Sequence, residues 1–389
     1  MKKKLLALTL AGTMLLGLLA GCGGGSTASS APSAGNSGEK VVTIGVFEPA
    51  SGDNAAGGKQ EVLGMKYAHD VQPTVESGGE EYKVELKIVD NQSSNDKAAT
   101  AAADLVNAGA SVVLGSYGSG VSIAGSDTFK NAGIPVIGVT CTNPQVTEGN
   151  THYFRICFLD PFQGTVLANF AMDNFSAKTA YALSKQGDDY SGGLCYYFKE
   201  AFEALGGTVV SAEFPEGTSD FSSYFGAVST EAAALIIDNA NAQSLGAPLL
   251  AGDTWDSNVV VGAAQGKDVE IYVTTFYQEG GDETFDKGFK EWINSDAQNL
   301  SENGDNDMIA AVSVMGYDAF FVALEALKNA GSTDPAKVNE ALWNTTWKGV
   351  SGDIAFESEN GDAIRDVAYV KQANTETGVW DFVAVQGVK

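Results

Sequence analysis

The chain has 389 residues, of which 44% are hydrophobic, and its formal net charge is −26. This length predicts about two globular domains with sizeable cores. The acidic balance excludes nucleic acids and anionic lipid surfaces as partners, because no basic patch is available to neutralise phosphates. It is typical of an exported protein that remains soluble through its charge.

The first 21 residues have the pattern of a secretory signal peptide. A basic stretch at residues 2–4 precedes an apolar run at 5–18, and the segment ends in Leu-Ala-Gly before Cys22. Cleavage at this point would leave 20 positive and 49 negative residues, a net charge of −29. Residues 22–40 are mostly Gly, Ser and Ala, a composition that predicts a flexible tether. The signal ending resembles a bacterial lipobox, which implies acylation of Cys22 and a lipid anchor on the extracellular face of the cell membrane.

Strands and helices alternate from residue 41 onward. The pattern predicts strands at 41–46, 82–90, 111–115 and 134–139, with helices at 59–71, 95–108 and 121–132 between them. Such alternation is typical of a parallel, doubly wound α/β sheet. The loop at 48–58 contains several glycines, which we expect to let the backbone turn and approach a ligand closely.

The alternation then begins again. Strands are predicted at 179–184, 208–214, 247–253 and 269–276, with a helix at 190–205. Helices at 282–296, 308–330 and 335–343 have no sheet of their own, so we expect them to return to the first sheet, while strand-like pieces follow near 354, 367–370 and 379–383. The expected architecture is two Rossmann-like lobes joined by a multi-strand hinge, with a ligand cleft between them. The N-terminal lobe would comprise 41–157 plus 279–355, and the C-terminal lobe 158–278 plus 356–389.

Sequence motifs for catalysis or metal binding are absent. The chain has no CxxC, HExxH or GxSxG motif, and the acidic stretch at 305–307 lacks the spacing of a calcium loop. We therefore expect no enzyme activity, metal or cofactor. Cys141, Cys157 and Cys195 are an odd number, which favours buried free thiols, although a bridge between Cys141 and Cys157 at neighbouring strand ends is an alternative.

A binding site is predicted where two neighbouring strands end in small polar residues, within residues 115–164. The turn at 116–120 joins a strand to a helix, so its backbone N–H groups and Ser119 favour an anion such as a carboxylate. The turn Thr140-Cys141-Thr142 lies at the end of the next strand and offers hydroxyl and backbone groups. Asp253, at the end of a second-lobe strand, is placed to accept an ammonium group, with a helix cap or turn former as the alternative.

Several segments together resemble one protein family. The chain is similar to the lipid-anchored solute-binding subunits of ABC importers, in the branched-chain amino-acid-binding (Leu/Ile/Val-binding) branch of the type I periplasmic binding proteins. The segments that carry the resemblance span nearly the whole mature chain and include IGVFEPASGDNAAGGKQ, VLGSYGSG, AGIPVIGVTCTNPQVT, YFRICFLDPFQG, PLLAGDTWDS and GYDAFFVALEALKNAGSTDP.

The resemblance implies a role for each matching site residue. Ser119 falls on the serine that holds the ligand carboxylate, and the turn at 140–142 falls on the segment that contacts both carboxylate and ammonium. Tyr190 falls on a tyrosine that closes over the ligand, and Asp253 on the residue that pairs with the ammonium. The implied partners are a small amino acid and a membrane permease, and the implied state is a monomer.

Two departures from the family pattern concern specificity and stability. Gly57 stands where many relatives have a tyrosine that walls the side-chain pocket. The chain is also about a dozen residues short between 225 and 231. We therefore expect a helix at 230–242 and a second lobe that lacks one strand, or alternatively a strand at 234–238. In either case we expect the ligand contact near Ser229 to be missing.

The leading hypothesis is an extracellular binding protein that captures an amino acid, by default leucine, isoleucine or valine, and delivers it to a permease. A ligand sensor or receptor of the same fold, and a binder of short amides or other small carboxylates, are the alternatives. An enzyme on the same α/β body is a third hypothesis, against which the absence of a nucleophile–base motif argues.

Overall fold

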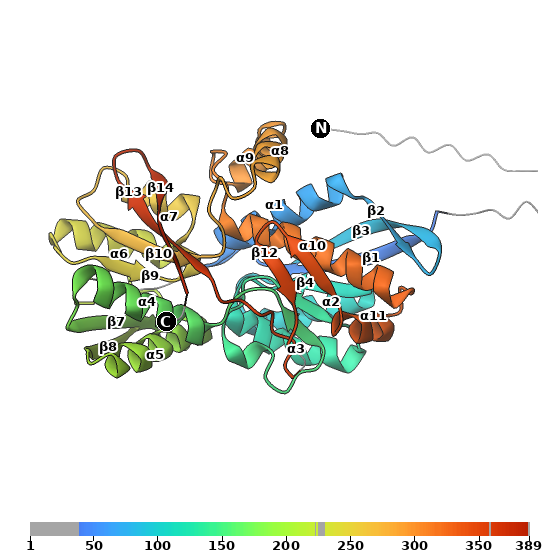
Figure 1. The fold of residues 1–389 in the computed structure, drawn as a ribbon, viewed down its shortest axis with the longest axis horizontal. Coiled ribbons are helices and arrows are strands. Elements are labelled where there is room, and N and C mark those ends of the chain that lie inside the picture. Colours follow the sequence, from blue (N-terminus) through green and yellow to red (C-terminus); the bar gives the residue numbers. More distant parts are fainter. Residues whose placement is uncertain (1–38, 222, 225–229, 358, 388–389) are drawn as a thin grey trace, which may run out of the picture. The chain divides into compact units, whose positions relative to one another are not determined.

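A computed structural model describes residues 39–221, 223–224, 230–357 and 359–387 (Figure 1). Residues Glu39–Lys389 form one compact unit. The predicted signal peptide, Cys22 and the contact expected near Ser229 lie outside the described residues. None of the helices in the described ranges is long and apolar enough to cross a membrane.

The N-terminal sheet is six-stranded, with the order β2-β3-β1-β4-β5-β6. Its pairs are parallel except β2–β3, a hairpin that turns at Gly78-Gly79. The sequence analysis missed β2, but the alternation that it predicted is confirmed. The elements in this part of the chain are β1 (Val41–Glu48), α1 (Ala55–Val71), β2 (Thr74–Ser77), β3 (Glu80–Asp90), α2 (Asn95–Asn107), β4 (Val112–Gly115), α3 (Ser119–Ala132), β5 (Val136–Gly138), η1 (Pro144–Val146) and β6 (Tyr153–Arg155).

The late helices return to the N-terminal sheet, as predicted. They are α8 (Glu283–Asn294), α9 (Ala297–Glu302), α10 (Ala311–Ala330) and α11 (Pro335–Leu342), followed by the hairpin of β11 (Thr346–Gly349) and β12 (Gly352–Ala355). Buried residues of α1, α8, α10 and α11 share one hydrophobic core with β1, β4 and β5. Helices α1 and α10 approach closely because Gly64 and Gly316 lie at their contact: a Cβ on Gly64 would lie 1.8 Å from the carbonyl oxygen of Ser313.

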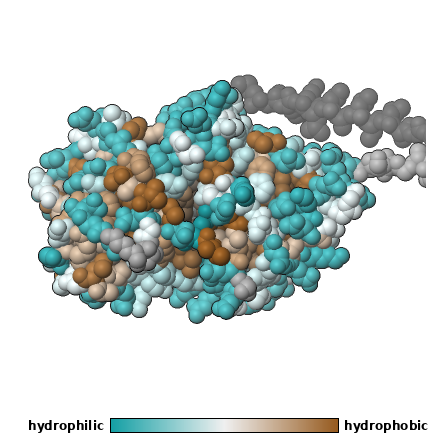
Figure 2. Space-filling model, viewed as in Figure 1, coloured by the Kyte–Doolittle hydropathy of each residue, from teal (hydrophilic) through white to brown (hydrophobic). Residues whose placement is uncertain are grey.

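The C-terminal half contains two separate sheets. Strands β7 (Thr179–Lys185) and β8 (Thr208–Phe214) form a parallel pair, and a four-stranded sheet has the order β14-β13-β10-β9. Figure 2 shows hydrophobic side chains gathered over the half that holds β9, β10, β13 and β14, with hydrophilic ones over most of the remaining visible face. The other elements here are α4 (Asp160–Phe175), α5 (Asp189–Ala204), α6 (Thr230–Ala242), β9 (Leu249–Ala251), η2 (Asp253–Trp255), α7 (Asn258–Ala264), β10 (Ile271–Thr275), β13 (Ala368–Asn374) and β14 (Val379–Gln386).

The predicted loss of one strand is confirmed for the described residues. Helix α6 covers 230–242, so residues 234–238 form helix and the alternative of a recruited strand is wrong. Within the described ranges, no strand pairs with the edge of β7 opposite β8, or with the edge of β9 opposite β10. The C-terminal half therefore lacks the element that would join its two sheets.

Two local expectations are wrong. Helix α1 begins at Ala55, so Gly57 and Gly58 belong to a helix and not to a loop. Strand β9 ends at Ala251, and Asp253 opens a short 3₁₀ turn instead of ending a strand. At the start of α1 tertiary contacts decide the backbone, since Gly58 lies against Pro49 and Gly57 against Tyr117.

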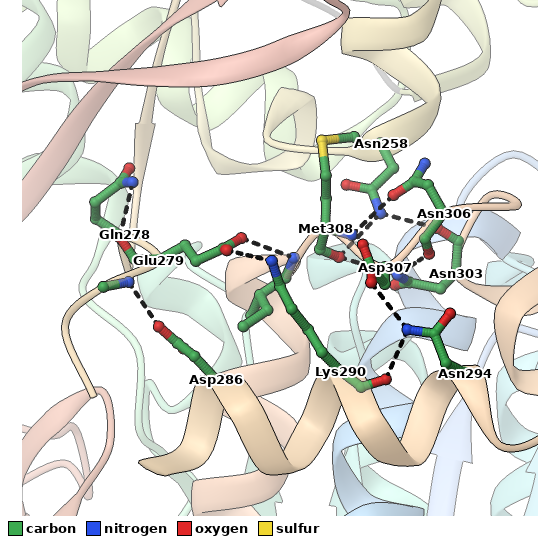
Figure 3. A network of polar contacts seen from close by, with 12 residues as sticks. Asn258, Gln278, Glu279, Asp286, Lys290, Asn294, Asn303, Asn306, Asp307 and Met308 are labelled. Carbon is green, nitrogen blue, oxygen red and sulfur yellow. Dashed lines mark hydrogen bonds and ion pairs between the residues drawn. The ribbon is translucent and has the colours of Figure 1, made fainter. Parts of the chain in front are cut away.

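A polar network ties α7 to the segment that leads into α10 (Figure 3). The Asn258 side-chain amide donates to the carbonyl oxygens of Asn303 (2.8 Å) and Met308 (3.3 Å). The Asn303 amide donates in turn to the carbonyls of Asn306 and Met308. Gln60 of α1 donates to Asn303 at 3.4 Å, so this loop is held from both halves of the molecule.

Candidate ligand-binding site

The first turn of α3 and the turn after β5 are joined at Ser119. Ser119 is the first residue of α3, is 1% exposed, and its Oγ accepts a hydrogen bond from the N–H of Asn143 at 3.2 Å. The Ser119 hydroxyl keeps its own proton to donate, beside the N–H groups that open a 14-residue helix. This place suits a carboxylate, as the sequence predicted.

The turn 140–142 is buried and fixed from several sides. Thr140 donates to the Glu61 carboxylate, and Arg155 donates to the carbonyl oxygen of Cys141 at 2.9 Å. The carbonyl of Thr142 accepts the N–H of Asp160 at 3.0 Å. The main-chain groups of this turn therefore hold other parts of the protein together.

The three cysteines in the described part of the chain are free thiols. Cys141 and Cys157 are buried, and Cys195 is partly buried. Burial raises the pKa of Cys141 to about 11 and that of Cys195 to about 12. The disulfide alternative is absent from the described residues.

Asp253 and Tyr190 lie in contact. The Asp253 Oδ1 accepts hydrogen bonds from the Tyr190 hydroxyl and from the Gln163 amide, both at 2.9 Å. Its Oδ2 is buried and has no hydrogen-bond partner among the described residues. Burial raises the pKa of Asp253 to about 6 against the opposing effect of the two hydrogen bonds. The carboxylate is therefore held through one oxygen, while the other is buried without a hydrogen-bond donor, and an ammonium group would supply one.

A small cavity of about 70 Å³ brings Ser119 and Tyr190 together. Residues after β1 and β4 line one side, and residues after β7 and β9 line the other. Asp253 is bonded to Tyr190, and Asn143, which follows the turn 140–142, is bonded to Ser119, so Asp253 and Asn143 contact the lining of this cavity without being part of it.

An ion pair crosses the cavity and was missed by the sequence analysis. The Lys185 ammonium of β7 lies 2.6 Å from Asp53, which follows β1. Both residues line the cavity, so the pair holds its two sides together. The two positions are 132 residues apart, and no local pattern could have linked them.

Tyr117 packs against Gly57. A Cβ on Gly57 would lie 2.3 Å from the Tyr117 ring, so the ring packs directly over this glycine. Tyr117 is 4% exposed, lines the cavity and donates from its hydroxyl to the carbonyl of Thr254 at 3.4 Å. An aromatic side chain from the turn after β4 therefore lines the cavity beside Gly57.

Four buried carboxyl groups surround the contact between the two halves. They are Glu48, Glu61, Asp160 and Asp253, each 1% exposed or less. Burial is the largest cause that raises each pKa, to about 8 for Glu61 and Asp160, and the neighbouring charge of Glu61 adds to it at Glu48. Across the described residues, no group of three or more His, Cys, Asp or Glu is placed to hold a metal ion.

The family model described as periplasmic binding protein matches residues 41–377. The chain belongs to this family. Leu/Ile/Val-binding protein homolog 1 of Brucella abortus (strain 2308) is 31% identical over 339 residues, which cover 82% of this chain and 87% of that protein. The leucine-binding protein LivK of Thermotoga maritima MSB8 has a TM-score of 0.77 at 32% identity, covering 89% of this chain and 99% of that one. The LivJ substrate-binding protein of Streptococcus pneumoniae, solved with isoleucine, shares the fold with a TM-score of 0.74 at 22% identity over 90% of this chain and all of that one.

These relatives confirm the predicted family and fold class. The relatives are named as leucine-binding, Leu/Ile/Val-binding and branched-chain amino acid transporter substrate-binding proteins. The site residues predicted from the sequence lie around the contact between the two halves, where Ser119 and Tyr190 share one cavity.

Proposed function

We propose that this protein is the extracellular substrate-binding component of an ABC importer and that it captures an amino acid between its two halves. The observation that carries this proposal is that two groups near the contact between the halves favour ligand groups of opposite charge. The N-terminus of α3 with Ser119 favours the carboxylate of the amino acid. The buried, unpaired oxygen of Asp253 favours its ammonium group. Both groups are 1% exposed, and electrostatic attraction is stronger where water is excluded.

The ligand enters when the two halves part. A cavity of about 70 Å³ is smaller than the roughly 300–1,000 Å³ of typical small-molecule sites. We propose that the halves are lobes with boundaries at 157/158, 278/279 and 355/356, and that Lys185–Asp53 re-forms on closure. Tyr190 would then cover the head group, the turn 140–142 would support its carboxylate, and Tyr117 would wall the side-chain pocket.

Leucine, isoleucine and valine are the first ligands to test, because the relatives are named for them. A thermal-shift screen of the twenty amino acids on the purified protein, followed by calorimetry, identifies the ligand. We expect Asp253→Ala and Ser119→Ala each to weaken binding at least tenfold, about 1.4 kcal/mol or more. Two positions on α3 outside the cavity lining provide matched controls: Asp127→Ala, at an exposed residue, and Ser126→Ala, at a half-buried one, should bind normally. Unchanged affinity in both site variants, or no binding of any amino acid, would contradict the proposal.

The membrane attachment is tested separately. We propose that Cys22 carries the lipid, that the protein acts as a monomer, and that the tether at 22–40 holds it near its permease. Mass spectrometry of the mature N-terminal peptide should show an acylated Cys22, and Cys22→Ser should release the protein into the medium. A membrane-bound Cys22→Ser protein would show that another element provides the attachment.

A further inference from the structure

An apolar slot separates β7 from β9. It is a cavity of about 460 Å³ lined by residues of both strands, of helices α4 and α5, and of the segment around Trp255. None of its lining residues is charged. The volume falls within the roughly 300–1,000 Å³ range of ligand sites.

The main-chain groups of β7 show which edge faces the slot. The carbonyl of Lys178 accepts the Thr208 N–H at 3.0 Å, and the Gln186 N–H donates to Phe214 at 2.8 Å. Even-numbered residues of β7 therefore point their main-chain groups toward β8, and the alternation of a strand turns those of Tyr181 and Leu183 away from it, toward the slot.

The opposite wall has the same character. The Leu249 N–H donates to the carbonyl of Glu270 at 2.8 Å, so Leu249 faces β10 and the main-chain groups of Leu250 face the slot. Within the described residues, neither of the two slot-facing edges is paired with a strand. Two strand edges with hydrogen-bonding capacity thus border one uncharged cavity.

The slot has apolar side chains on both faces of the interrupted sheet. Ala182 and Leu250 belong to one cluster with α4 and α5, whereas Leu183 and Leu249 belong to another with α6 and α7. Successive residues of a strand point to opposite faces. An occupant in the plane of the sheet would therefore meet apolar side chains above and below, as the central strand of a parallel sheet does.

We propose that this slot is a binding site for one extended, uncharged, apolar peptide segment, which adds a strand between β7 and β9. Main-chain hydrogen bonds to the two edges would supply affinity, as in other strand-addition complexes. The apolar walls select a continuous apolar run and disfavour a charged side chain, which would be buried without a counter-ion. A compact apolar ligand would fill the volume but leave the main-chain groups of the two strand edges unpaired. Hydrogen bonding to these edges therefore distinguishes a peptide from a compact ligand.

The test uses the purified protein and the synthetic peptide Ac-Lys-Val-Ile-Val-Ile-Val-Lys-NH₂, whose terminal lysines keep it soluble. We expect it to bind in calorimetry and to raise the Tm by about 5 °C at 100 times its Kd. Two further peptides carry N-methyl groups on alternate residues. In one peptide the methyl groups replace the N–H groups that would face β7, and in the other those that would face β9. Each should bind at least tenfold more weakly, because each loses the donors to one wall.

A matched pair of protein variants probes the edge itself. Tyr181→Pro removes a slot-facing N–H while leaving the β7–β8 bonds, and Ser211→Pro removes an N–H on the outer edge of β8. Tyr181→Pro should abolish peptide binding, and Ser211→Pro should preserve it. The methylated peptides keep the test decisive if Tyr181→Pro does not fold.

Three results would overturn the proposal: absence of peptide binding, equal binding of the methylated peptides, or tighter binding of a compact apolar dye such as anilinonaphthalene sulfonate at the same site. Unchanged leucine binding in the presence of the peptide would not affect it, because the slot is separate from the cavity that holds Ser119.

Discussion

In the N-terminal sheet, the inner strands β3, β1, β4 and β5 each pair with a strand on both sides. In the C-terminal half, β7 and β9 each lack one such neighbour among the described residues. Both halves show the same alternation of strands and helices. Only 15 residues, 215–229, connect β8 to α6, and a parallel neighbour requires a crossover of about 12 residues in addition to the strand itself. This short connection therefore accounts for a sheet that is interrupted between β7 and β9 among the described residues.

The cores follow the sheets. The continuous N-terminal sheet has one large cluster on the face covered by α1, α8, α10 and α11 and a second cluster on the face covered by α2 and α3. The C-terminal half divides its buried residues among smaller clusters on either side of the interruption. Each added strand of a continuous sheet extends the same two apolar faces. The following experiments would sharpen or break this comparison.

The largest effect is expected from two helical glycines. Gly64→Ala places a Cβ 1.8 Å from the Ser313 carbonyl and should destabilise the protein by about 3 kcal/mol, because the helices α1 and α10 must separate. Gly262→Ala in α7 meets nothing within 4 Å and should stabilise it by about 0.5–1 kcal/mol. Urea unfolding of the two variants measures both changes. Equal effects would mean that the α1–α10 contact is no tighter than the surface of α7.

The pH dependence of stability probes the contact between the halves. The pKa of Asp253 is about 6, and those of Asp160 and Glu61 are about 8, all above their ordinary values of 3.8 and 4.5. The folded protein therefore binds more protons than the unfolded chain between about pH 4 and pH 8, and its stability should fall as the pH rises through this window.

For the ligand-free protein we expect a loss of several kcal/mol between pH 5 and pH 8.5, measured by urea unfolding at each pH. Glu61→Gln on the N-terminal side and Asp160→Asn on the C-terminal side should each flatten the curve. An exposed substitution, Asp127→Asn, should leave it unchanged. Stability that rises with pH would contradict the assignment of buried, protonated carboxyl groups.

Replacing an alanine by leucine should change the stability in opposite directions in the two cores. Ala102→Leu overfills a packed position on α2 and should cost about 1–3 kcal/mol. Ala171→Leu on α4 points into the slot and should stabilise the protein by about 1 kcal/mol, because it fills empty volume. Thermal unfolding of both variants provides the comparison, and a destabilised Ala171→Leu would mean that the slot is not open space.

Thiol labelling provides the smallest signal. Cys195 lines the slot, whereas Cys141 and Cys157 are 0% exposed. Iodoacetamide should therefore modify Cys195 first, although slowly, because burial raises its pKa to about 12. Peptide mapping by mass spectrometry follows each site. Equal labelling of Cys141 and Cys195 would contradict the difference in access between the two halves.

Local sequence patterns predicted most of the elements. The predicted strand at 208–214 matches β8, and the helix at 335–343 differs from α11 by one residue. The hairpin of β2 was missed although Gly78-Gly79 is a recognisable turn signal. The start of α1 was missed for a different reason, because Gly57 and Gly58 are poor helix formers and only the packing of Tyr117 and Pro49 against them explains their place.

The resemblance to the family predicted the missing strand. The sequence pattern by itself determined the α/β class, the return of the late helices and the small polar turns that carry Ser119 and Thr140. These follow from hydrophobic periodicity and turn chemistry, which act over a few residues. The tertiary structure decided the rest: Tyr117 over Gly57, Lys185 on Asp53, the second oxygen of Asp253, and the slot between β7 and β9. Each of these joins groups distant in the chain, and only the packing of the whole chain brings them within reach.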